Sequence, residues 1–112
     1  MISWLRVLGS KWQVVTDEHL LHDEDRWGDT NQRTRVIRVD PHSEQPSTMF
    51  HELTHIIEWG MGVEETDEQA VQSFAKCWAA VFSDNPELVA WMIKEIDKHL
   101  PGYSNKIKGK LG

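Results

Sequence analysis

The residues His51-Glu52-Leu53-Thr54-His55 form the pattern H-E-x-x-H, in which two imidazoles stand four positions apart. Residues at this spacing lie one turn above each other on a helix, so both rings can bind one metal ion. Glu52 lies beside His51 and can reach a water molecule at that ion as a general base. A shuffled chain of this composition would contain the pattern only about 0.03 times. The pentapeptide therefore predicts a zinc site with His51 and His55 as ligands and Glu52 as the catalytic base.

A catalytic zinc ion takes three protein ligands and keeps one position open for water. The longer pattern that supplies a third histidine is excluded, because Glu58 and Met61 stand where it requires glycine and histidine. In the other known arrangement, the third zinc ligand is a glutamate from the following helix. Glu64, Glu65 and Glu68 all lie in that region.

Among these three glutamates we predict Glu68 as the third ligand, with Glu65 as the next choice. Thr66 and Gln69 predict a helix start just before Glu68, which places this carboxylate in a first helical turn. The apolar residues that share its face, Val71, Ala75 and Trp78, predict packing against the metal-binding helix.

The first forty residues must provide the sheet that supports this helix. Residues 4–8 and 12–14 alternate with period two around Gly9-Ser10, which is typical of a β-hairpin. The polar, glycine-containing segment 22–33 predicts a loop. Thr34–Val39 predicts a third strand, rich in β-branched residues and ended by Asp40-Pro41.

The pentapeptide lies in the first of three predicted helices. Ser43 or Ser47 caps the start of this helix, and Gly60 and Gly62 end it. Its apolar stripe consists of Met49, Phe50, Leu53, Ile56 and Ile57.

Two more helices follow. The second begins at Thr66, and the third has Asn85 as its cap, Pro86 at its first position and Pro101-Gly102 as its end. The predicted buried stripe of the second helix consists of Val71, Phe74, Ala75, Trp78 and Phe82. The apolar residues that line the third helix are Leu88, Trp91, Met92 and Ile96.

Strands followed by helices predict an α+β fold with a small, mostly antiparallel sheet and about three helices. Residues 1–100 predict a single domain, as expected for a chain of 112 residues. Residues 101–112 contain Lys106, Lys108 and Lys110 but no acidic residue, and they predict a flexible basic tail.

Composition narrows the possible partners. The net charge of −6 argues against binding to a nucleic-acid backbone, which requires a basic face. The apolar runs are too short to span a membrane. Cys77 is the single cysteine, so an internal disulfide is excluded and the cytosol is the expected compartment.

Taken together, these residues resemble the active-site region of gluzincin metallopeptidases. The spelling His-Glu-Leu-Thr-His is shared with the thermolysin family. The short chain, its N-terminal hairpin and the strand Val36–Val39 resemble small phage- and prophage-encoded zincins, and the segment from Glu68 to Ala75 is similar to the glutamate helix of the ImmA/IrrE metallopeptidases. The resemblance spans most of residues 2–93.

This resemblance implies a minimal zincin-like domain that hydrolyses a peptide bond in a bacterial cytosol, with a peptide or protein as its substrate. It further implies that Gln72, four residues after Glu68, forms a hydrogen bond to a zinc-binding histidine without binding the ion itself. The strand Thr34–Val39 is expected to be an edge strand that binds substrate backbone. Tyr103 or His99 is a candidate for stabilising the oxyanion, and no positional argument separates the two.

Three alternatives stay open at this point. The histidines can lie on an ordinary amphipathic helix, the metal can be structural or partner-binding without turnover, or the peptidase can be latent until a partner or the tail moves.

Trp27, in the polar loop, is the tryptophan placed to touch a substrate. The remaining histidines lack ligand spacing and are interpreted as surface residues: His19, His22, His42 and His99.

Overall fold

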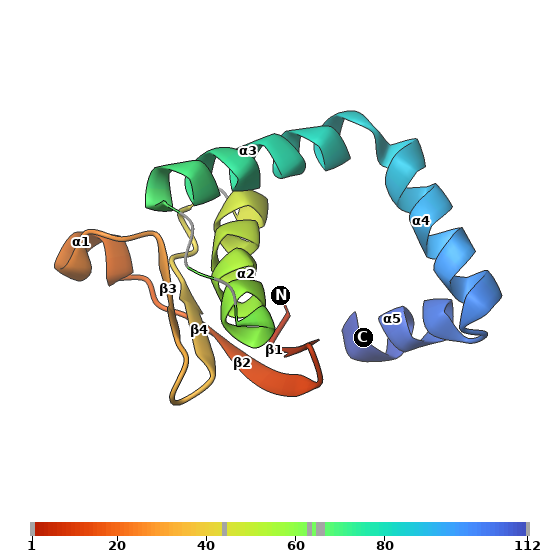
Figure 1. The fold of residues 1–112 in the computed structure, drawn as a ribbon, viewed down its shortest axis with the longest axis horizontal. Helices are drawn as coiled ribbons and strands as arrows, with labels where there is room; N and C mark the ends of the chain where they lie inside the picture. Colours follow the sequence, from red (N-terminus) through yellow and green to blue (C-terminus); the bar gives the residue numbers. More distant parts are fainter. Residues whose placement is uncertain (1, 44, 63, 65–66, 112) are drawn as a thin grey trace. The chain divides into compact units, whose positions relative to one another are not determined.

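The computed structural model describes residues 2–43, 45–62, 64 and 67–111 (Figure 1). The described chain has an α+β fold with four strands and five helices, which confirms the predicted fold class. It divides into two compact units, one formed by Ser3–Ala79 and the other by Met1–Ile2 with Ala80–Gly112. The two units are described separately.

The first unit contains a four-stranded mixed sheet. Strands β1 and β2 pair antiparallel, β2 and β4 pair parallel, and β4 and β3 pair antiparallel, so the order across the sheet is β1-β2-β4-β3. The strands are β1 (Trp4–Val7), β2 (Ser10–Thr16), β3 (Gly28–Asn31) and β4 (Val36–Val39).

The predicted hairpin at the start of the chain is confirmed. Trp4 pairs with Gln13 and Val7 pairs with Ser10, which leaves a two-residue turn. Both turn residues have positive φ, 48° at Leu8 and 83° at Gly9. Two positive φ values give a turn whose twist matches that of the strands it joins.

Two predictions about the rest of the sheet are wrong. Segment 22–33 is not only a loop, because it contains the end of a short helix and strand β3. The strand predicted at 34–39 begins later, at Val36, and lies in the middle of the sheet, so it is not an edge strand. The edge next to it is β3, whose sequence Gly-Asp-Thr-Asn has low intrinsic β-propensity and gains its structure from pairing with β4.

The three predicted helices correspond to α2, α3 and α4, and two more helices were not predicted. One of these, α1, is a single short turn of helix before the sheet edge, and the other, α5, lies within residues 101–112. The mobility expected for that tail stays a prediction. The helices are α1 (Leu20–Glu24), α2 (Gln45–Met61), α3 (Glu68–Asp84), α4 (Pro86–His99) and α5 (Tyr103–Leu111).

The helix starts differ in detail from the prediction. Ser47 lies inside α2 and is buried, so it is not the cap, and the Ser43 hydroxyl donates to the Asp40 carbonyl oxygen at 2.8 Å. At α3 the Asp67 side chain accepts hydrogen bonds from the backbone N–H groups of residues 69 and 70, at 2.8 and 3.2 Å. Thr66, the predicted cap, lies outside the described residues. Pro86 is the first residue of α4, as predicted.

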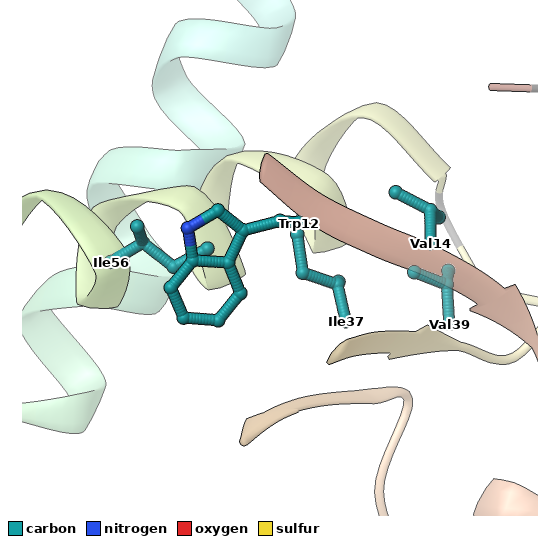
Figure 2. Close-up of a cluster of buried hydrophobic side chains, with 5 residues drawn as sticks. All are labelled: Trp12, Val14, Ile37, Val39 and Ile56. Carbon is teal, nitrogen blue, oxygen red and sulfur yellow. The ribbon is translucent and has the colours of Figure 1, made fainter. Parts of the chain in front are cut away.

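The core of the first unit forms between the sheet and α2. Trp12 and Val14 on β2 and Ile37 and Val39 on β4 alternate toward one face, where Ile56 of α2 meets them (Figure 2). The partly buried residues packed around this cluster are Leu5, Val7, Met49, Leu53 and Trp59. The sheet therefore binds the face of α2 that carries residues 49, 53 and 56.

The stripe predicted on α3 is only partly buried. Val71 and Ala75 are buried, whereas Phe74 and Trp78, predicted to be buried with them, are 63% and 53% exposed. None of the residues of α4 is buried. Among the described helices, none combines the length and apolar character needed to cross a membrane.

Arg38 of β4 connects the sheet edge to α1 through ion pairs. Its guanidinium donates to both carboxylate oxygens of Asp29 on β3 and to both of Glu24, the latter at 2.9 and 3.2 Å. Asp17 accepts a longer bond at 3.4 Å. These hydrogen bonds, first that to Asp29 and then that to Glu24, raise the pKa of Arg38 above its ordinary value. The short edge strand is thus held by side chains as well as by its backbone.

The core assignment predicts a large effect of truncating Ile37, whose side chain is fully buried. We expect Ile37→Ala to lower the free energy of unfolding by about 2–5 kcal/mol, because the lost methyl groups leave a cavity. The matched control is Ile57→Ala on the 42% exposed side of α2, expected within about 0.5 kcal/mol of wild type. Denaturant unfolding measures both, and equal losses would contradict this core.

Candidate metal centre

The pentapeptide lies in the middle of α2, so both of its histidines project from one side of a regular helix. The His51 and His55 side chains are 19% and 12% exposed. Their Nε2 atoms lie 3.2 Å apart, and their rings meet edge to face at 65°. The spacing of four residues has therefore brought two nitrogen donors to one point.

Glu68, in the first turn of α3, faces the same point. Its Oε2 lies 2.9 Å from His51 Nε2, and its Oε1 lies 2.5 Å from His55 Nε2. The carboxylate side chain is 70% exposed, so it approaches the imidazoles from the solvent side. Gly62, with φ of 67°, follows the end of α2, and the Asp67 cap begins α3. The start of α3 thus places a glutamate at the histidine pair.

These three residues are placed so that they could hold one metal ion. Ligand atoms from His51, His55 and Glu68 all lie within 4.8 Å of one another. Two nitrogens on a tetrahedral zinc ion at 2.0–2.1 Å should lie about 3.3 Å apart. The two Nε2 atoms, 3.2 Å apart, have this separation, whereas the Glu68 oxygens lie closer to them, at 2.9 and 2.5 Å. Two histidines and one glutamate are also a donor set found at catalytic zinc sites.

The alternative glutamates are not part of this cluster as it is described. Glu64 is exposed and does not belong to the group of ligand atoms found among the described residues. Glu65 lies outside the described residues. Among the described glutamates, Glu68 is therefore the one that lies at the histidines.

Glu52 is buried beside the cluster and belongs to a different set of contacts. It is only 5% exposed, and its Oε1 accepts a hydrogen bond of 2.7 Å from the Thr30 hydroxyl. Burial raises the pKa of the Glu52 carboxyl above its ordinary value. The Thr30 hydrogen bond lowers it in part, as do the nearby charges of His51 and His55. A carboxylate with a raised pKa is suited to accept a proton near neutral pH.

The contact between Glu52 and Thr30 depends on a close approach of β3 to α2. Gly28, the first residue of β3, permits this approach because it lacks a side chain. A Cβ built there would lie 2.9 Å from Thr48 Cγ2, 3.1 Å from the Arg38 carbonyl oxygen and 3.5 Å from Glu52 Cγ. Glycine thus lets the edge strand lie directly against the metal-binding helix.

A hollow of about 550 Å³ opens beside these residues. It is lined by Trp27, the tryptophan that the sequence analysis selected as a possible substrate contact. Gln72 also lines it, and the hydrogen bond predicted from Gln72 to a histidine stays a prediction. Tyr103 and His99, the expected oxyanion candidates, lie in the other compact unit. The lining consists of Asp25, Arg26, Trp27, Gly28, His42, Ser47, Thr48, His51, Glu52, Glu68, Gln72, Ala75 and Lys76.

His42 also lines this hollow, although the sequence analysis interpreted it only as a surface histidine. Its backbone N–H and its ring Nδ1 donate to Asp40 Oδ1, at 2.9 and 3.0 Å. Asp40 is itself 2% exposed and accepts a bond from the Leu21 N–H at 3.2 Å. With Nδ1 bound to Asp40, the Nε2 of this 74% exposed ring is the atom left for a ligand. An aspartate two residues before a histidine was the local signal.

Comparison with known proteins gave no match to a family model, to a curated protein or to a solved structure.

The close approach at Gly28 predicts that even one methyl group is harmful. We expect Gly28→Ala to lower the free energy of unfolding by about 1–3 kcal/mol, because the added Cβ overpacks the contact between β3 and α2. Thermal or denaturant unfolding measures the loss. Gly109→Ala is the control, since a Cβ there meets nothing within 4 Å. Equal stability of the two variants would contradict the close packing.

Proposed function

We propose that this chain is a zinc-dependent peptidase. The observation that carries the proposal is the convergence of His51, His55 and Glu68 beside the buried carboxylate of Glu52, with all but His55 lining one hollow. Three protein ligands leave a tetrahedral ion one position for water or substrate. Among the described residues the cluster contains no fourth ligand, which favours turnover over a closed structural site.

The residues divide the chemistry between them. A zinc ion held by His51, His55 and Glu68 would lower the pKa of water toward neutrality and would polarise a substrate carbonyl. Glu52 accepts the proton of the attacking water and later donates it to the leaving amine. Thr30 holds the Glu52 carboxylate at 2.7 Å, so the base is oriented before substrate arrives.

The edge of the sheet suggests how a substrate is held. Strand β3 is the last strand on its side of the sheet, and its Thr30 bonds the catalytic base. An extended peptide can pair with the outer edge of such a strand through backbone hydrogen bonds. The substrate is then a peptide or an unfolded segment of a protein in the cytosol, with Trp27 beside the bound chain.

Zinc content is the first test. Purified protein is expected to contain one zinc ion per chain, and His51→Ala, His55→Ala or Glu68→Ala should lose most of it, because each removes a ligand. Elemental analysis measures the occupancy. Glu64→Ala is the matched control for Glu68→Ala and should retain zinc. If Glu65→Ala alone among the glutamate variants lost the metal, Glu65 would be the third ligand.

Glu52→Gln is the second test, because it separates the base from the metal ligands. We expect this variant to keep its zinc but to lose at least about 100-fold in peptidase turnover, since an amide cannot accept the proton. Cleavage of an unfolded protein by metal-loaded wild type and variant is compared, with zinc measured in the same samples. Undiminished turnover in Glu52→Gln would show that the base lies elsewhere.

A further inference from the structure

A second buried glutamate, Glu58, lies near the proposed metal site without facing the ion. It stands on α2, three residues after His55, and is only 6% exposed. Acidic side chains are rarely buried to this extent unless they are paired, because an ionised carboxylate is strongly solvated in water. Its Oε1 lies 3.4 Å from His55 Nδ1, and both atoms are shielded from solvent.

The two nitrogens of the His55 imidazole therefore face two different carboxylates. Nε2 faces Glu68 at 2.5 Å, on the side of the metal ligands, and Nδ1 faces Glu58 on the inner side. The ring is also stacked on Trp59, with centroids 6.1 Å apart and planes at 23°. Trp59 in turn stacks on Trp12 of the core at 6.5 Å. Glu58 thus lies at the inner edge of the His55 ring, and Trp59 lies against its face.

We propose that Glu58 positions His55 for metal binding by accepting the Nδ1–H of its neutral imidazole. A histidine that binds a metal through Nε2 must carry its proton on Nδ1, and an acceptor at Nδ1 selects this tautomer and strengthens the Nε2 donor. This inference rests on the metal site of the proposed function. It adds a positioning residue that the H-E-x-x-H pattern does not include.

A merely structural role for Glu58 makes a different prediction. If the carboxylate only filled space in the core, an apolar residue of similar length would serve as well in the metal-free and the metal-bound protein. Replacing a buried ionic group by an apolar one is often neutral or stabilising for the fold itself. Loss of zinc affinity without loss of metal-free stability therefore identifies a positioning role.

The experiment compares Glu58→Met and Glu58→Gln with wild type in the full chain. Zinc affinity is measured by competition with a chelator, and thermal unfolding of the metal-free protein is measured in parallel. We expect Glu58→Met to bind zinc about 10–100-fold more weakly while its metal-free form melts at or above the wild-type temperature. Glu58→Gln keeps an oxygen acceptor and should recover most of the affinity. Glu64→Gln, an exposed neighbour, should match wild type.

Two results would overturn the inference. Zinc affinity of Glu58→Met within twofold of wild type would show that no Nδ1 acceptor is needed. An equal loss of affinity in Glu58→Met and Glu58→Gln would show that an oxygen acceptor at this position does not set the affinity. A wild-type protein that binds no zinc would overturn the proposed function as well. Zinc binding by wild type with an unaffected Glu58→Met variant would overturn the positioning role alone.

Discussion

The packing of α2 against the sheet orients every side chain that α2 contributes to the candidate site. Met49, Leu53 and Ile56 contact the core cluster of Trp12, Ile37 and their neighbours, and the helical period then determines the direction of the remaining residues. The histidines of the pentapeptide point toward the start of α3, and Glu52 points toward β3. A rotation of α2 about its axis would move both ligands and base together, so the apolar contacts set the geometry of the polar ones.

The parts of the site that the sequence predicted are those that depend on local periodicity. His51, Glu52 and His55 belong to one helix, and Glu68 follows from the start of the next helix, so their spacing in the chain carries most of the information. The hairpin and the central strand follow equally from alternation of apolar residues. These features were predictable because a regular helix or strand converts sequence distance directly into direction.

Other parts depend on contacts between distant segments, and the sequence did not reveal them. Strand β3 has no apolar alternation and exists because β4, Arg38 and α2 all contact it. Its formation made β3, rather than β4, the edge of the sheet. The prediction that the aromatic residues of α3 are buried was wrong for the opposite reason. Periodicity identifies an apolar face of a helix but does not show how much of that face is covered by another element. His42 was not selected because the sequence does not show that its hydrogen-bond partner, Asp40, is buried.

The topology of the sheet has a consequence for the order of folding. Each antiparallel pair, β1 with β2 and β3 with β4, joins segments that are close in the chain and can close early. The parallel pairing of β2 with β4 joins Gln13 to Val36, so it must enclose a much longer loop and should form late. The candidate ligands His51, His55 and Glu68 and the candidate base Glu52 all follow β4 in the sequence. A transient opening between β2 and β4 would therefore separate the supporting hairpin from a segment that still carries the complete site.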